Sequence, residues 1–210
     1  MELIVSTCRV LASRPRLRLL QAVYAQPDAA VQVLAQTVGQ PVSTTSHHLN
    51  VLSGYRFLHT EPSGRHVYCQ PGQTALSSNP FLRSLQELLH DWFAHADLDR
   101  TVVQVCAAGT PPSWEAVFDA LIKLFTTYTH LRRLLILRAV SRRGACAAAD
   151  LVESIGMSPD AARRQLDKLR RRGLLATDLD VPDRWHLAPL AGPVAQRKLW
   201  AVVQGELMNG

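Results

Sequence analysis

The chain of 210 residues has no apolar run close to the ~20 residues that a membrane-spanning helix needs. No basic stretch precedes the apolar part of its first segment, so we expect no signal peptide and a cytoplasmic protein. It has no low-complexity tract, and 47% of its residues are apolar. We therefore expect a folded protein of one or two small domains that makes no contact with a membrane.

The sequence is also poor in cysteine. Cys8, Cys69, Cys106 and Cys146 are far apart and form no CxxC pair. This spacing argues against a disulfide framework and against a zinc knuckle. It favours reduced thiols that are buried as small apolar side chains.

Motifs of the common enzyme classes are missing as well. The sequence contains no Gly-rich phosphate loop, no nucleophile elbow and no pair of catalytic carboxylates. We therefore expect the protein not to be an enzyme, and we expect no catalytic residue and no cofactor.

Positive charge is present in excess, with a net charge of +6, and it is unevenly distributed. Residues 8–71 hold six Arg and Lys against two acidic residues, and residues 130–189 hold twelve against seven. Residues 72–129 hold three against six. Two basic segments around an acidic one favour a polyanionic partner, because phosphates that are neutralised by Arg and Lys release counterions. The alternative explanation of the excess charge is that surface arginines only keep the protein soluble.

The sequence repeats itself at a shift of 117 residues. Residues 19–58 align without a gap over residues 136–175, and the apolar positions agree throughout. Gly39 falls on Gly156 in this alignment. A unit of this length is too long for a solenoid repeat, so we interpret the sequence as two copies of a small domain.

Each copy predicts the same order of elements: a helix, a shorter helix that ends at a glycine, a third helix, and two strands joined by a turn. In the second copy Ser158 can cap the third helix, and Pro159 suits its first position. In the first copy Pro41 occupies the capping position, so we expect another residue to cap this helix, with Ser43 as the candidate. The expected first and second helices are residues 16–25, 29–38, 131–142 and 147–155, and the expected strands are 57–61, 66–70, 174–178 and 184–188.

This order is typical of a winged helix-turn-helix, in which the third helix lies in the major groove and the hairpin contacts the backbone alongside. We therefore expect a mainly α fold with small β-hairpin wings, built as tandem winged helix-turn-helix domains. The expected division is an N-terminal winged-helix domain with flanking dimerisation-type helices at 1–98, a linker at 99–112, and a divergent C-terminal winged-helix domain at 113–210.

Three segments of the first copy resemble a known family: "ASRPRLRLLQAV", "LAQTVGQPVSTTSHHLNVL" and "GRHVYCQP". They look like the ArsR-type bacterial transcriptional repressors, and the resemblance covers residues 5–97. The second copy is similar to that family only at the level of the winged helix. The resemblance implies a DNA-binding regulator, normally a symmetric dimer with one winged helix per subunit.

The third helix of the first copy has Thr45, Leu49 and Leu52 at the spacing of a buried stripe. The opposite face and its flanks carry short hydroxyls suited to phosphates, and imidazole and amide groups suited to base edges. A purely structural helix is the alternative. The candidate DNA-binding residues of this helix are Ser43, Thr44, Ser46, His47, His48 and Asn50.

The third helix of the second copy repeats the buried spacing, but its outer face is strongly basic. Its side chains suit phosphates, and Arg164 or Lys168 can reach guanine. A solvated face, with ion pairs from Asp167 to the residues four positions away on either side, is the alternative. Because one outer face is polar and the other is charged, we expect the two helices to recognise unlike half-sites. The candidate DNA-binding residues are Arg163, Arg164, Lys168 and Arg171.

The turns between the strands differ too. Arg65 and His66 follow the tight turn of the first wing as DNA-binding candidates, and Arg65 can enter the minor groove or bind a phosphate. In the second wing three aspartates precede Arg184 and would repel phosphate. We expect this wing to pack through Trp185 and to be the weaker candidate for DNA contact.

No metal site is expected. The two adjacent histidines on the third helix of the first copy point ~100° apart, which is poor geometry for the binding of one metal ion. The resemblance implies cysteine ligands on the second helix, but Ala30 and Gln32 occupy those positions. Asp91 and His95 share a helix face and offer two ligands, yet an ordinary polar helix end is the favoured explanation.

The leading hypothesis is a sequence-specific transcriptional regulator of double-stranded DNA, a repressor located at the nucleoid. The alternative is a winged-helix adaptor that binds proteins in a larger assembly. In the family that the first copy resembles, the terminal helices pair across the dimer. Here one chain contains two sets of such terminal helices. Either the two copies pair within the chain as a pseudo-dimer, or two chains form a homodimer with four winged helices.

Overall fold

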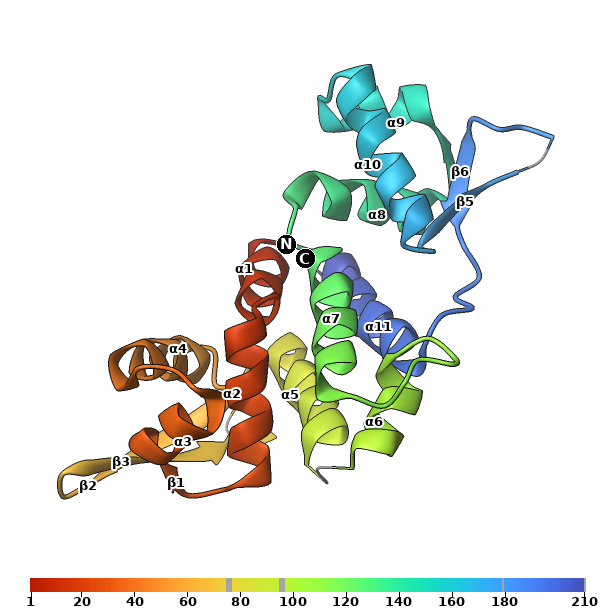
Figure 1. Cartoon of the computed structure of the whole chain (residues 1–210). Coiled ribbons are helices and arrows are strands. Elements are labelled where there is room, and N and C mark those ends of the chain that lie inside the picture. Colours follow the sequence, from red (N-terminus) through yellow and green to blue (C-terminus); the bar gives the residue numbers. More distant parts are fainter. Residues whose placement is uncertain (75–76, 95–96, 179, 210) are drawn as a thin grey trace.

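The computed structural model of the chain describes residues 1–74, 77–94, 97–178 and 180–209. These residues form eleven α-helices and two antiparallel sheets of three strands each. The fold is mainly α with two small β-hairpin wings, as the sequence predicts. Figure 1 shows the two winged helices at opposite ends of the molecule, with a group of helices between them. None of the described helices is long and apolar enough to cross a membrane.

The N-terminal winged helix follows the predicted order of elements. Gly39 ends the second helix with a φ of 65°, a left-handed conformation that glycine adopts without steric cost. This helix begins later than predicted, because Ala29 and Ala30 form a short strand that pairs with Cys69 and Tyr68. The elements are α2 (Arg14–Ala25), β1 (Ala29–Ala30), α3 (Val31–Val38), α4 (Val42–Gly54), β2 (Leu58–Ser63) and β3 (His66–Pro71).

The C-terminal winged helix has the same plan. Gly156 again ends the second helix with a positive φ, here 66°. A short first strand again precedes the second helix, with Cys146 opposite Trp185. The strand orders β1-β3-β2 and β4-β6-β5 are therefore equivalent. The elements are α8 (Leu131–Arg143), β4 (Ala145–Ala147), α9 (Ala148–Ile155), α10 (Pro159–Arg171), β5 (Leu175–Thr177) and β6 (Arg184–Leu187).

Five further helices lie between the winged helices (Figure 1). The helices α1 and α7, each of which precedes a winged helix, pack against each other. The helices α5 and α11, each of which follows a winged helix, also pack against each other. Each of these four helices thus contacts its counterpart in the other copy, and α6 has no counterpart among the described elements. The bounds of these helices are α1 (Glu2–Leu11), α5 (Pro80–Phe93), α6 (Leu98–Val105), α7 (Trp114–Thr126) and α11 (Val194–Asn209).

Buried side chains join these helices into one continuous core. The rings of Trp92 on α5 and Phe125 on α7 lie 6.3 Å apart between centroids. Tyr128, directly after α7, stacks on Trp200 of α11 at 6.4 Å. Burial of such large aromatic surfaces is a main source of folding free energy. The two copies therefore share a core and are not two separate hydrophobic units.

Ion pairs also connect the copies. Arg14 of α2 pairs with Glu115 and Asp119 of α7, and Arg18 lies 2.7 Å from the Glu115 carboxylate. Hydrogen bonding from Arg18 is the main cause that lowers the pKa of Glu115. Part of the positive charge of the N-terminal segment is thus paired within the molecule by the acidic connector.

The segment predicted as a linker, 99–112, begins as a helix. The side chain of Asp97 caps α6 by accepting a hydrogen bond from the Arg100 N–H at 3.0 Å. Thr101 is buried and donates from its hydroxyl to the Trp92 carbonyl at 2.8 Å. Only the part from Cys106 to Ser113 lies outside a helix, and the division of the chain into domains stays a prediction.

Candidate nucleic-acid interface

The helix α4 packs against α2 and α3. Thr45, Leu49 and Leu52 are buried, which confirms the predicted stripe. The residue before the helix is Pro41, and its first turn has no side-chain cap. The prediction that Ser43 caps this helix is wrong, because Ser43 is the second residue of the helix and lies too late in the chain to do so. The N–H groups of the first turn therefore remain open to an external acceptor.

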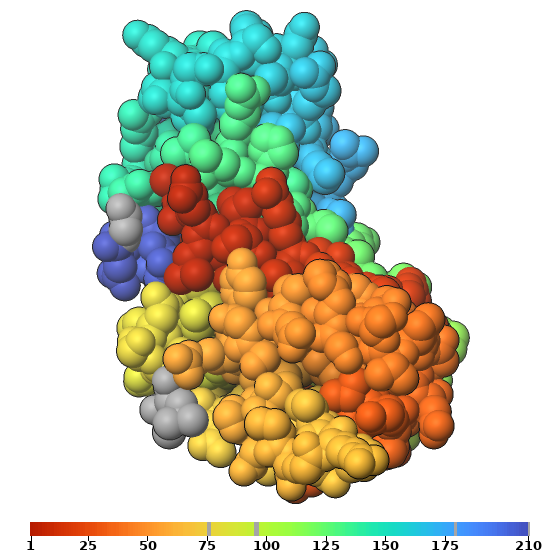
Figure 2. All heavy atoms as spheres, turned by 90° about the vertical axis from the view of Figure 1, so that its left-hand side faces the viewer, coloured from red at the N-terminus to blue at the C-terminus, as the bar shows by residue number. Residues whose placement is uncertain are grey.

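The outer face of α4 is free of the protein core. Figure 2 shows the orange segment that contains α4 and the cyan segments of the second winged helix on the same side of the molecule. Between Val42 and Gly54 there is no charged residue other than histidine. The candidate residues Ser43, Thr44, His47 and Asn50 are exposed, and Ser46 and His48 are half-buried.

His48 differs from its neighbour His47. Its Nδ1 atom is buried and has no hydrogen-bond partner in the described part of the chain. Burial lowers the pKa of His48, and the nearby charges of Arg16 and His47 lower it further. His48 is therefore held neutral at pH 7, which leaves His47 as the more accessible hydrogen-bonding imidazole of this helix.

The first wing is an exposed hairpin. Its strands pair from Leu58 opposite Pro71 to Ser63 opposite His66. Gly64 in the turn has a φ of 61°, a left-handed conformation that favours glycine. Arg65 and His66 are both exposed at this tip. The wing therefore presents a cation at its end, as the sequence predicts.

The helix α10 begins with a side-chain cap, because the Ser158 hydroxyl accepts a hydrogen bond from the Ala161 N–H at 3.3 Å. Its buried stripe is Ala162, Leu166 and Leu169, at the spacing found in α4. Four candidate cations lie on the remaining surface. Arg163, Arg164 and Arg171 are exposed, and Lys168 is half-buried.

The ion pair on α10 is not one of those expected for the alternative of a solvated face. Asp167 pairs with Arg170 at 3.1 Å, three residues away, and not with the arginines four residues away on either side. Arg170 also lies over the ring of Trp185 at 5.8 Å, which holds it beside the sheet. Within the described residues, Arg163 and Arg164 form no ion pair, so both guanidinium groups are available to an anion.

Cations accumulate around Lys168, which the sequence does not reveal. The charge of Arg133 on α8 is the main cause that lowers the pKa of Lys168, followed by burial and by Arg172 and Arg171. Arg133 is only 4% exposed, and two of its nitrogens have no hydrogen-bond partner in the described residues.

The second wing is acidic at its tip and packed at its base. Trp185 is buried, as predicted. His186 lies 3.4 Å from the Asp178 carboxylate. Asp178, Asp180, Asp183 and Arg184 are exposed. The wing therefore offers a surface of mixed charge, less suited to phosphate than the first wing.

The polar end of α5 is occupied by ion pairs and aromatic contacts. Asp91 pairs with Lys198 at 2.6 Å and with Arg100 at 2.9 Å. His90 packs edge-on against Tyr24. His95, the other ligand considered for a metal, lies outside the described residues. Within the residues that the structure describes, no three potential ligands gather.

Residues 130–177 match the profile of a family of bacterial regulatory proteins, the arsR family. The match covers α8, β4, α9, α10 and β5, and less than a quarter of the chain. It indicates a helix-turn-helix of the kind found in these DNA-binding regulators. The searches of curated proteins and of solved structures found no significant match.

The match falls on the copy for which the sequence predicts only a general similarity. The resemblance of residues 5–97 to the same family stays a prediction. The polar run that suggests the family in the first copy forms the outer face of a helix, where residue types are free to vary. Both copies have the glycine terminus and the leucine stripe of the motif, and the second copy adds the serine cap that the first lacks.

Proposed function

We propose that this protein is a sequence-specific regulator of transcription, a repressor, that binds double-stranded DNA through α4 and α10. One observation carries this proposal. Both third helices bury one stripe and leave the opposite face uncovered, at the position that a winged helix-turn-helix inserts into the major groove. The arsR-family match supports the assignment for α10.

The helices α10 and α4 would make different contributions to DNA binding. The exposed Arg163 and Arg164, with Lys168 and Arg171, supply the charge that attracts phosphates in any sequence. The neutral face of α4 supplies hydrogen-bonding groups, among them Asn50 and His47, that distinguish base edges. Ser43, Thr44, Ser46, His48 and the first wing, with Arg65 and His66, would contact the backbone beside them.

We further propose that one chain acts as an intramolecular pseudo-dimer. The packing of α1 on α7 and of α5 on α11 supports this, because these contacts occupy the faces that two separate subunits would otherwise use. The ion pairs of Arg14, Arg18 and Lys198 support it too, since each joins one copy to the other. A single chain would then bind two unlike half-sites.

The test is selection of genomic DNA fragments by the purified full chain, followed by binding measurements at several salt concentrations. The proposal expects enrichment of a non-palindromic duplex site and an affinity that falls steeply with salt. Enrichment lost in Arg65→Ala and Ser46→Ala, but kept in Glu87→Gln on α5, would place the contact on the proposed face. A chain that selects no duplex even at low salt would favour the protein-binding adaptor instead.

A further inference from the structure

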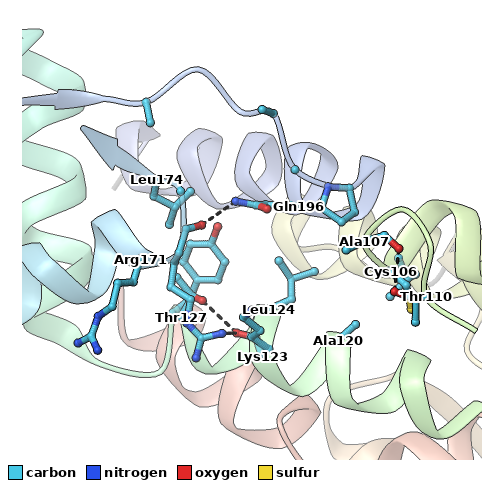
Figure 3. A pocket seen from close by; sticks show the side chains of 18 of the residues that line it. Cys106, Ala107, Thr110, Ala120, Lys123, Leu124, Thr127, Arg171, Leu174 and Gln196 are labelled. Carbon is cyan, nitrogen blue, oxygen red and sulfur yellow. Dashed lines mark hydrogen bonds between the residues drawn. The ribbon is translucent and has the colours of Figure 1, made fainter. Parts of the chain in front are cut away.

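A cavity of about 520 Å³ lies where the second winged helix meets the central helices. Its walls come from α7, from the end of α10, from the segment that leads into α11, and from the residues after α6. Figure 3 shows Leu124 and Ala120 of α7 facing Gln196 of α11 across this space. The volume is within the range of small-molecule sites, about 300–1,000 Å³.

Most of the wall is apolar. Leu124, Leu174, Ala116 and Ala120 line it together with several prolines and alanines. Cys106 also lines it, and burial raises the pKa of this thiol, so the sulfur is a neutral wall atom and not a nucleophile. Such a wall excludes a polar sugar or a nucleotide base as the main part of an occupant and favours an aliphatic or aromatic body.

One buried donor in this wall has no partner. Tyr128 is fully buried, and its hydroxyl forms no hydrogen bond within the described residues. An unsatisfied buried hydroxyl destabilises the fold, so a ligand oxygen that accepts from it would recover that energy. Gln196, whose Nε2 donates to the Arg172 carbonyl at 2.8 Å, places a second polar group, an amide, at the same wall.

The charged residues of the wall are all cations. Lys123, Arg171 and Arg172 line the cavity, and the described lining includes no aspartate or glutamate. The Arg172 guanidinium donates to the Lys123 carbonyl at 2.7 Å, which keeps it at the edge of the cavity. Arg171 turns its guanidinium away from Leu124 and Gln196, so only its stem forms wall (Figure 3). Arg172 and Lys123 are the remaining cations among the lining residues.

We propose that this cavity binds a small organic anion, a molecule with an apolar body and a carboxylate. The apolar wall would take the body, the Tyr128 hydroxyl would donate to the carboxylate, and the cations at the edge would balance its charge. The site does not depend on the proposed DNA binding, because every observation that supports it concerns the cavity alone.

The test is calorimetric titration of the full chain with three probes of equal chain length: decanoate, decanol and decyltrimethylammonium. The proposal expects saturable binding of one decanoate per chain, with an affinity about tenfold above that of decanol, because charge-assisted hydrogen bonds are the stronger ones. Decyltrimethylammonium should bind more weakly still. Equal binding of all three probes, or no saturation by decanoate, would overturn the proposal.

Three variants locate the site. Ala120→Phe fills the cavity and should weaken decanoate binding about tenfold or more. Tyr128→Phe removes only the hydroxyl that has no partner, so it should keep or raise thermal stability and weaken decanoate about fivefold. Lys123→Gln should weaken decanoate but not decanol, whereas Arg142→Gln, an exposed cation outside the cavity, should change neither. Full decanoate affinity in both Ala120→Phe and Tyr128→Phe would exclude this cavity as the site.

Discussion

The two winged helices have the same architecture and opposite surface chemistry. The stretch Val42–Gly54 carries no lysine, arginine or carboxylate, whereas Pro159–Arg171 carries five cations and two aspartates. Both helices nevertheless bury the same positions, with Leu52 equivalent to Leu169. The buried stripe sets the fold, and the outer face is free to change its chemistry because no packing constrains it.

This difference allows the two helices to carry separate parts of one binding free energy. Phosphate contacts made by arginine and lysine depend on salt and little on sequence, whereas hydrogen bonds to base edges depend on sequence and little on salt. Changing one helix at a time therefore separates the two contributions.

The largest effect is expected from the shared stripe. Leu52→Ala and Leu169→Ala each remove a fully buried side chain, so each should lower the free energy of unfolding by ~2–5 kcal/mol. Denaturant unfolding measures this, with Leu131→Ala at a largely exposed position as the control. A large cost in one copy and none in the other would show that the two stripes are not equivalent.

The next effect concerns the charge of α10. Arg164→Glu should weaken DNA binding by ~2 kcal/mol and reduce the salt dependence, because a phosphate-facing cation becomes an anion. Fluorescence anisotropy at several salt concentrations measures both. Arg197→Glu on α11 makes the same charge change on a central helix and should have little effect. Equal losses in the two variants would mean that only total charge matters.

A smaller and more selective effect is expected from α4. Asn50→Ala should cost ~1–2 kcal/mol on the selected site and almost nothing on unrelated DNA, because an amide contact to a base edge is lost. The salt dependence should stay the same. Competition between selected and random duplexes separates these outcomes, and a uniform loss on both would assign Asn50 to the backbone instead.

The smallest effect concerns the ion pair between Asp91 on α5 and Lys198 on α11, which connects the two copies. Hydrogen bonding from Lys198 is the main cause that lowers the pKa of Asp91 below its ordinary value of 3.8. The ion pair therefore stabilises the fold above that value, and its contribution disappears as the pH falls through the lowered pKa.

Asp91→Asn should lower the unfolding free energy by ~1 kcal/mol at pH 7, and the difference from the original chain should vanish in strong acid. Denaturant unfolding over a pH series measures this, with Glu87→Gln as the control, because Glu87 forms no ion pair within the residues that the structure describes. A deficit that persists unchanged at low pH would mean that packing, and not charge, joins α5 to α11.

Much of the fold could be predicted because the signals are local. Apolar spacing fixed the three helices of each copy, and Gly39 and Gly156 marked the ends of the second helices. The strands β1 and β4 could not be predicted, because two or three residues are too few to show an alternating pattern. The helix α6 was missed because its short apolar face becomes evident only when it is packed against α7.

The candidate interface could be predicted as a set of exposed side chains, but not its electrostatics. Arg14 and Arg18 add to the basic character of the sequence, yet they pair with Glu115, about a hundred residues later in the chain. Arg133 contributes to the charge around Lys168 only through the packing of α8 on α10. Such pairings depend on the tertiary fold, and no local pattern announces them.

Native mass spectrometry of the chain on a duplex that carries its selected site tests the central claim most directly. One chain with two unlike recognition helices predicts a complex of one chain per duplex, on a site without palindromic symmetry. Two chains on a palindrome, or no complex at low salt, would contradict it.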